Sequence, residues 1–428
     1  MLGQKLHTIN RAFISDENRY KEVMIKDIPI MVNELGEVVC IPVESEVFSA
    51  GICGTSGSGK TMLLNRLLTG IYYQWGANCA IMNDLSNETF KWSEPMTNWE
   101  FNEDNWNWIH QKPIPSPIVY LFLNSNTSQI PTHKISSKPY IKIILPFKEI
   151  MDKLGFFLKG VLPDFDLGKS AMYVDALKEK LIVCETPEQV KEILEEELPG
   201  ADGKNFKAMR IKIITAFDAL MKEEILDITN PECHAKVKLG TYLGNPFSAI
   251  MKAKEIPSLI TSNLIEKRYK SEVFAYYMDL LFQNNLKDFP NEKTFLFFDE
   301  LREVTTKEDE PASEALSRIS ARGRINNVGL IYATQFYNLI PQCVKGAKLN
   351  YCFVFAHSNT TILNEIGNDF DLDRDMRKKI KNFAKFECMA LTHNKFACYK
   401  DGDRYETTKP QTGRILYPLA NHKKVGEE

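Results

Sequence analysis

The stretch Gly51–Asn65, GICGTSGSGKTMLLN, contains four glycines and one lysine directly ahead of an apolar helical pattern. Within it, Gly54–Thr61 fits the pattern G-x-x-x-x-G-K-[ST]. An apolar strand, SEVFSAGICG, precedes this segment and a helix, KTMLLNRLLTGIYYQW, follows it. Glycines allow backbone N–H groups to turn inward around an anion, and the start of a helix adds its positive dipole end. The stretch therefore predicts a phosphate-binding loop, with a plain glycine-rich turn as the alternative.

Lys60 and Thr61 have individual roles in such a loop. The lysine reaches the β- and γ-phosphates of a nucleotide, and the threonine hydroxyl is a ligand of Mg²⁺. We therefore expect a nucleoside triphosphate, ATP, together with Mg²⁺ as cofactors. The residues expected to hold the phosphates are Gly54, Thr55, Ser56, Gly57, Ser58, Gly59, Lys60 and Thr61.

A second segment, KTFLFFDEL at residues 293–301, has the pattern of a buried strand that ends in two carboxylates. Asp299 is placed to hold Mg²⁺ through water, and Glu300 can polarise the attacking water as a general base. An acidic junction between a strand and a loop is the ordinary alternative, but a phosphate loop upstream favours the catalytic interpretation. Two adjacent carboxylates favour a hydrolase over a kinase or a passive nucleotide binder.

A third segment, ALSRISARGRINNVGLIYATQ at residues 315–335, is predicted to form a helix followed by a strand. The strand brings Thr334 and Gln335 to the same sheet edge as the phosphate loop. A glutamine at this edge can sense the γ-phosphate or orient water, as glutamines do in GTPases.

The predicted helix carries Glu314, Arg318 and Arg322 at i, i+4 spacing, and Gly323 can end it. For Arg318 we expect a salt bridge within the helix. Arg324, just beyond the helix, is the better candidate for an arginine finger that acts on the nucleotide of a neighbouring subunit.

Strands and helices alternate along much of the chain, which predicts an α/β fold with a mainly parallel sheet. Residues 151–255 differ, because a capping box begins at Thr186 and an amphipathic helix covers residues 205–224. The expected divisions are a small N-terminal β region (1–45), the first part of an ATPase core (46–150), a helical insertion (151–255), the second part of the core (256–400) and a polar C-terminal tail (401–428).

The chain has 428 residues and a net charge of −3. It has no run of about 18 apolar residues that could span a membrane, and no signal for secretion, so we expect a cytoplasmic protein. Proteins that bind nucleic acid over a whole face are usually basic, so any DNA contact must be local. A candidate is the cluster Arg374, Arg377, Lys378, Lys379 and Lys381, for which a solvated helix face is the favoured interpretation.

Together, GICGTSGSGKT, FLFFDEL and RGRINNVGLIYATQ resemble the HerA/FtsK superfamily of ring-forming P-loop ATPases. The resemblance covers about residues 46–150 and 256–400, and it implies a RecA-like core. It assigns Lys60 and Thr61 to the phosphate loop and Gln335 to a polar sensor. It also implies that Asp299 and Glu300 form the acidic pair.

The resemblance further implies that Arg324 or Arg322 is the arginine finger, and that Asp84 occupies an acidic position common in the HerA branch. Two positions depart from the usual pattern. Phe336–Tyr337 follows the sensor glutamine where Arg-Pro is usual, and Asn327 stands where a glycine is usual.

Members of this superfamily typically form hexamers that move duplex DNA through a central channel. The resemblance therefore implies an ATP-hydrolysing homo-oligomer, a hexamer, that translocates double-stranded DNA. DNA end processing with a nuclease, conjugative transfer with a relaxase and viral genome packaging into a capsid are the settings left open. The alternatives are a type IV secretion-like ATPase that acts on protein or pilus assembly, and a nucleotide-gated switch or scaffold.

Overall fold

The computed structural model describes residues 27–43, 47–84, 89–96, 114–123, 138, 140–161, 170–198, 204–222, 226–227, 233–237, 240–243, 246–260, 270–289, 291–305, 311–400 and 403–420. The chain divides into two compact units. The first comprises Met1–Ile118, Ile250–Leu259 and Phe274–Glu428, and the second comprises Val119–Ala249 and Ile260–Val273. Each unit is described by itself.

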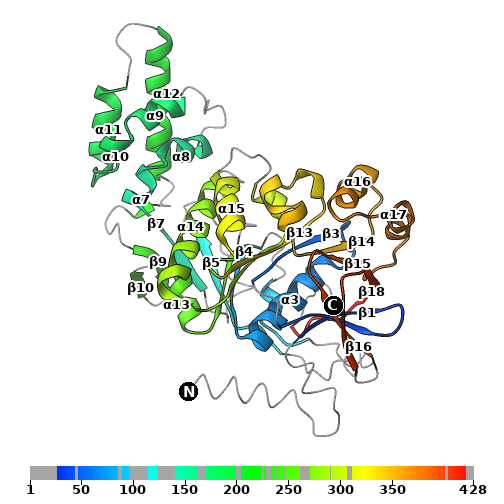
Figure 1. The fold of residues 1–428 in the computed structure, drawn as a ribbon. Coiled ribbons are helices and arrows are strands. Elements are labelled where there is room, and N and C mark those ends of the chain that lie inside the picture. Colours follow the sequence, from blue (N-terminus) through cyan, green and yellow to red (C-terminus); the bar gives the residue numbers. More distant parts are fainter. Residues whose placement is uncertain are drawn as a thin grey trace. The chain divides into compact units, whose positions relative to one another are not determined.

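The half of the first unit's sheet that carries the predicted loop is mainly parallel (Figure 1). Its strands are β3 (Ser49–Cys53), β4 (Asn78–Asp84), β11 (Ile256–Ile260), β12 (Thr294–Phe298), β13 (Val328–Thr334) and β14 (Tyr351–Phe355), in the order β11-β4-β12-β13-β3-β14. Every residue of β12 and β13 is buried, as expected for strands covered on both faces. This arrangement confirms the α/β class and brings the carboxyl ends of β3, β12 and β13 to one edge.

Helices and 3₁₀ turns connect the strands of the first unit. They are α3 (Lys60–Trp75), α4 (Thr89–Trp92), α13 (Pro246–Lys252), α14 (Lys270–Asp288), α15 (Pro311–Arg322), α16 (Thr360–Asp369) and α17 (Arg374–Lys381), with short 3₁₀ turns η3 (Leu301–Glu303), η4 (Tyr337–Leu339), η5 (Gln342–Val344) and η6 (Gly346–Lys348). Helix α3 packs against β3, β4 and β13, and α15 packs against β13. Within the described ranges, none of the helices has both the length and the apolar character needed to cross a membrane.

The other half of this sheet is antiparallel and mixes the two ends of the chain. Its strands are β1 (Ile28–Asn33), β2 (Val38–Ile41), β15 (Glu387–Thr392), β16 (Phe396–Lys400), β17 (Asp403–Thr407) and β18 (Gln411–Ile415), which continue from β14 in the order β15-β18-β1-β2-β16-β17. Strand β18 is hydrogen-bonded between β15 and β1. The N-terminal strands are therefore held by C-terminal ones.

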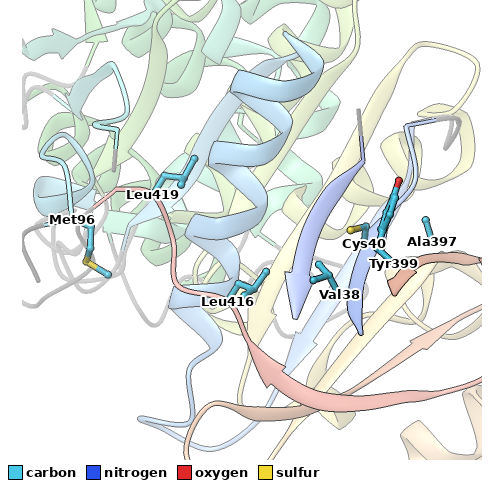
Figure 2. Packing of buried hydrophobic residues seen from close by; sticks show 7 residues of the cluster. All are labelled: Val38, Cys40, Met96, Ala397, Tyr399, Leu416 and Leu419. Atoms are coloured by element: carbon cyan, nitrogen blue, oxygen red, sulfur yellow. The ribbon is translucent and has the colours of Figure 1, made fainter. Parts of the chain in front are cut away.

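The expected polar tail over residues 401–428 is wrong for residues 403–420, which form β17, β18 and a buried segment after them. Strand β17 lies at the end of the sheet and leaves most of its side chains to solvent, so its composition is polar. The segment after β18 buries Leu416 and Leu419 in a cluster of apolar side chains. Figure 2 shows Leu416 on the side of Val38 and Leu419 on the side of Met96.

The second unit contains strands as well as helices. Strand β5 (Ile118–Leu123) pairs parallel with β6 (Tyr140–Ile143), while β9 (Cys233–Val237) pairs antiparallel with both β6 and β10 (Gly240–Leu243). Short strands β7 (Leu145–Pro146) and β8 (Leu226–Asp227) form a separate pair. The helices are α7 (Phe147–Met151), α8 (Leu154–Val161), α9 (Ser170–Ala176), α10 (Lys178–Leu181), α11 (Pro187–Glu196) and α12 (Lys204–Lys222).

The helices of the second unit form as the sequence predicts, although the unit is wider than the expected insertion at 151–255. The Thr186 side chain accepts a hydrogen bond from the Gln189 backbone N–H. The Gln189 side chain accepts one from the Thr186 backbone N–H, which completes the capping box of α11. On α12, the predicted apolar face buries Ile213, Phe217 and Leu220. The unit begins at Val119 because β5 and β6 belong with it.

We predict that Leu419→Ala lowers the free energy of unfolding by about 2–5 kcal/mol, because it leaves a cavity in this cluster of apolar side chains. Leu419 is 1% exposed, whereas Leu35, in the turn between β1 and β2, is 71% exposed. The matched control Leu35→Ala should change stability by less than about 0.5 kcal/mol. Urea denaturation of the full chain measures both, and equal effects would contradict the buried role of this segment.

Candidate functional site

The predicted phosphate loop connects β3 to α3, and its glycines occupy positions that other residues would strain. Gly57 has a φ of 74° and Gly59, the N-cap of α3, has a φ of 120°, both outside the range that side chains favour. A Cβ on Gly54 would lie 2.6 Å from the Cβ of Phe355. The loop is therefore a strand-to-helix turn whose backbone path depends on these glycines.

The loop is closed by its own hydrogen bonds. Lys60 Nζ and Ser58 Oγ both donate to the carbonyl of Thr55, each at 2.8 Å. Thr55, Ser56 and Gly57 are exposed, whereas Lys60 is 8% exposed. A buried ammonium so placed, at the start of a helix, is available to an anion that offers stronger acceptors than a single carbonyl.

Thr61 and Asp299 come together as the sequence predicts. The Thr61 hydroxyl donates to Asp299 Oδ1 at 3.4 Å, which joins the start of α3 to the end of β12. Asn83, near the end of β4, also contacts this residue: its side-chain amide donates to the Asp299 backbone carbonyl at 2.7 Å. A hydroxyl and a carboxylate oxygen are ligands that Mg²⁺ prefers, so these two residues fit a magnesium ion. Asp84, the last residue of β4, ends this neighbouring strand.

Glu300 has a strained backbone and a fixed side chain. Its φ of 62° and ψ of 75° place a non-glycine residue in the left-handed region, which costs of the order of 1–3 kcal/mol. Thr334 Oγ1 donates to Glu300 Oε1 at 2.8 Å. The backbone N–H of Gln335 donates to Oε2 at 3.0 Å and to Oε1 at 3.2 Å. The end of β13 thus holds the carboxylate that β12 delivers.

Burial raises the pKa of the Glu300 carboxyl above its ordinary value. The hydrogen bonds from Thr334 and Gln335 oppose this effect, as does the charge of Lys60. The neighbouring charge of Asp299 raises the pKa further. A carboxylate with a raised pKa accepts a proton more readily, which suits a general base.

His357 is a site residue that the sequence did not reveal. It follows β14 and is buried, and its Nε2 donates to the carbonyl of Gln335 at 3.1 Å. The ring proton is on Nε2 because the other nitrogen, Nδ1, accepts a hydrogen bond from the backbone N–H of Asn359 at 3.2 Å. Asn359 is itself the N-cap of α16. His357 therefore connects the predicted sensor to the helix that follows β14.

The residues that sequence reasoning missed share one signal. Asn83 and His357 each stand at or just after the carboxyl end of a buried parallel strand, as does Thr334, which the sequence placed at this edge without its bond to Glu300. Ligands of open α/β sheets bind at this edge, so the first polar residue after each strand is a candidate. Only pairing between distant segments shows which of them meet.

The two finger candidates lie away from the loop of their own chain. Arg322 ends α15, and Arg324 follows Gly323; both arginines are exposed. They precede β13, whereas Gln335 follows it, and a strand of this length spans about 20 Å. The structure therefore brings the phosphate loop, the acidic pair and the sensor together, and it does not bring Arg322 or Arg324 to them.

Two other predictions for this segment are confirmed. Arg318 donates to Glu314 at 2.6 Å, the salt bridge expected within the helix, and it also pairs with Asp279. A Cβ on Gly323 would lie 2.4 Å from the carbonyl oxygen of Val328, so the helix must end in glycine there.

Asn327 explains one departure from the superfamily pattern. Its φ is 56°, in the left-handed region where glycine is favoured. Asparagine tolerates this region better than most residues do, so it can replace the usual glycine without changing the backbone.

The basic cluster forms helix α17, and its charges contact the same chain. Arg377 donates to Asn364, Lys379 to Glu34, and Lys381 to Thr360. Three of its five cations thus already have acceptors, which supports the interpretation as a solvated helix face.

The order of the parallel strands and the glycine loop between β3 and α3 define a RecA-like P-loop nucleoside triphosphatase fold. No protein-family model matches the chain, and no curated protein sequence matches it. Among solved structures, VirB4 of Thermoanaerobacter pseudethanolicus is similar, with a TM-score of 0.51 and 14% identity over 91% of this chain and 96% of that chain. The plasmid coupling protein TrwB, in complex with a non-hydrolysable ATP analogue, has a TM-score of 0.50 and 13% identity over 97% of this chain and 95% of that chain. These similarities confirm the predicted fold.

Proposed function

We propose that this chain is a P-loop ATPase that uses ATP and Mg²⁺ and acts as a ring-forming motor on double-stranded DNA. The observation that supports ATPase activity is that four side chains lie together at one edge of the sheet. Lys60 and Thr61 come from the loop, and Asp299 and Glu300 from β12. This is the set that ATP hydrolysis needs: a cation for phosphate, oxygen ligands for a metal and a base for water.

The residues have separate tasks in this reaction. Lys60 exchanges the carbonyl of Thr55 for the β- and γ-phosphates of ATP. Thr61 and Asp299 would hold Mg²⁺, which neutralises charge on the phosphate oxygens when it is bound. Glu300 orients the attacking water and accepts its proton.

The position of Arg324 supports action between subunits. It lies before β13, about 20 Å of strand from the end where Thr334 and Gln335 stand. A finger at this position cannot serve the nucleotide of its own chain, so it would serve that of a neighbour. A closed ring, which we propose to be a hexamer, gives every site such a neighbour.

Double-stranded DNA is the proposed substrate because the fold is shared with TrwB, which is described as a plasmid coupling protein. A relaxase is then the partner to expect first, ahead of a nuclease or a capsid. A second candidate function is a secretion-type ATPase acting on protein or pilus assembly, which the similarity to VirB4 favours.

The two acids should fail in different ways. Glu300→Gln should keep binding ATP and Mg²⁺ while hydrolysis falls about 10²–10⁴-fold, the usual contribution of a general base. Asp299→Asn should instead weaken the Mg²⁺-dependent part of binding. Phosphate release and binding of a fluorescent ATP analogue, with and without Mg²⁺, measure the two effects. Equal loss of nucleotide binding in both variants would refute this division of roles.

Duplex DNA should raise the rate of ATP hydrolysis if DNA is the substrate that the motor moves. The steady-state rate is measured without nucleic acid, with duplex DNA and with heparin, which carries a similar charge but no base pairs. Lys60→Ala gives the background rate, because it removes the cation that binds phosphate. Stimulation by DNA alone supports the motor on DNA, whereas an unchanged rate favours the secretion-type alternative.

Mixed rings test the finger. Arg324→Ala should bind ATP normally but hydrolyse it about 10³–10⁵-fold more slowly, the range measured for arginine fingers in GTPases. Lys60→Ala subunits keep the finger and lack a working loop, so mixing the two inactive variants should restore activity where a good loop faces a good finger. Arg322→Ala, treated identically, decides which arginine acts. Mixed rings that stay inactive would count against a finger in trans.

A further inference from the structure

We propose that Arg302 and Phe336 form a cation–π latch that positions Glu300. The proposal rests on the proposed ATPase function, because it assigns positioning residues to the general base of that reaction. The guanidinium of Arg302 lies over the ring of Phe336, with its central carbon 4.2 Å from the ring centre. A guanidinium at this distance from an aromatic face is attracted by the negative charge of that face.

The latch joins the segment that carries Glu300 to the segment whose residues donate hydrogen bonds to its carboxylate. Arg302 belongs to η3, two residues after Glu300, and Phe336 directly follows Gln335. The two segments continue β12 and β13, which are neighbouring parallel strands. The segment after β12 and the end of β13 are therefore joined by two contacts. One is the hydrogen bond between Thr334 and Glu300, and the other is the stack of Arg302 on Phe336.

Hydrogen bonds complete the circuit. The backbone N–H of Phe336 donates to Thr334 Oγ1 at 3.0 Å, and that hydroxyl donates onward to Glu300 Oε1. The direction of each bond is thereby fixed, because the hydroxyl has one proton and it is given to the carboxylate. Phe336 is thus linked to Glu300 in two ways. Its N–H bonds to the Thr334 hydroxyl, which bonds to Glu300, and its ring contacts Arg302, two residues after Glu300.

The carboxylate needs such support for two reasons. The left-handed backbone at Glu300 is strained, and strain of this kind persists only where the surroundings hold it. The bonds from Thr334 and Gln335 also use the two oxygens unequally: Oε1 accepts two donors and Oε2 accepts one. Oε2 keeps capacity for a water molecule, so a fixed orientation decides which oxygen meets the water.

Phe336 is also an exposed apolar residue that packing alone does not account for. It is 38% exposed, and it stands where members of the HerA/FtsK superfamily, which the sequence resembles, usually have an arginine. Leu339, three residues later, is an apolar side chain with the same 38% exposure and no role in the circuit. Leu339→Ala is therefore the matched control for the loss of an exposed apolar side chain.

The first test separates turnover from binding. Phe336→Leu and Arg302→Gln should each lower kcat about 2- to 5-fold, the factor expected for a cation–π pair at an exposed site, with KM for ATP unchanged. Because both changes break one interaction, the double variant should lose no more than either single variant. Phe336→Tyr, which keeps an aromatic face, should restore the wild-type kcat. Additive losses, or a Tyr variant as slow as the Leu variant, would overturn the latch.

The second test needs no nucleotide. Hydrogen exchange in the ATP-free full chain, followed by mass spectrometry, should show the amides of Gln335 and Phe336 exchanging about 2- to 5-fold faster in Phe336→Leu than in wild type. Leu339→Ala should leave them unchanged. Unaltered exchange in Phe336→Leu would refute the latch even if the protein hydrolyses ATP. If instead wild type and Glu300→Gln hydrolyse ATP equally slowly, the proposed function fails while this exchange test still stands.

Discussion

The parallel pairing of β12, β13, β3 and β14 is the constraint on which the site depends. Parallel strands present their carboxyl ends at one edge, so each of these four strands delivers one part of the site. Strand β3 delivers the phosphate loop, β12 the acidic pair, β13 the sensor and β14 His357. A shift of the pairing by one residue would turn the terminal side chains to the opposite face, and the contact between Glu300 and Thr334 would be lost.

Two of the five non-glycine residues with positive φ in the described part of the chain lie at this edge. Glu300 has a positive φ, and so does Phe386, whose φ is 71° and whose N–H donates to the carbonyl of Ser58 in the phosphate loop. Bulky residues rarely adopt this conformation, and each instance has a cost that surrounding contacts must offset. Here the strain at Phe386 is offset by its hydrogen bond to the loop, and the strain at Glu300 by its hydrogen bonds from the end of β13. These two strained residues therefore belong to or contact the two parts of the site that a nucleotide would contact, the base and the loop.

The sequence was sufficient for some parts of this site and insufficient for others, for a physical reason. The loop at Gly54–Thr61 and the acids at 299–300 were predicted because their chemistry follows from short, fixed spacing along the chain. The bond between Thr334 and Glu300 and the place of His357 were not, because they depend on pairing between segments far apart in sequence. The same limit explains the C-terminal error: the polar side chains of β17 are those of a solvent-facing edge strand, and a tail has the same composition.

Strand β13 gives the molecule a rigid connection between its two edges. All seven of its residues are buried; β12 pairs with its residues 328–332 and β3 with its residues 330–334, so it cannot bend without breaking a ladder. One end carries Gln335 and Thr334, which hold the base of this chain's own site, and the other end follows Arg324. If Arg324 serves a neighbour, a change that nucleotide causes at Glu300 acts on the same strand that positions the finger. In such a ring, coordination between sites would require no additional element, because one buried strand would have an end at each of two active sites.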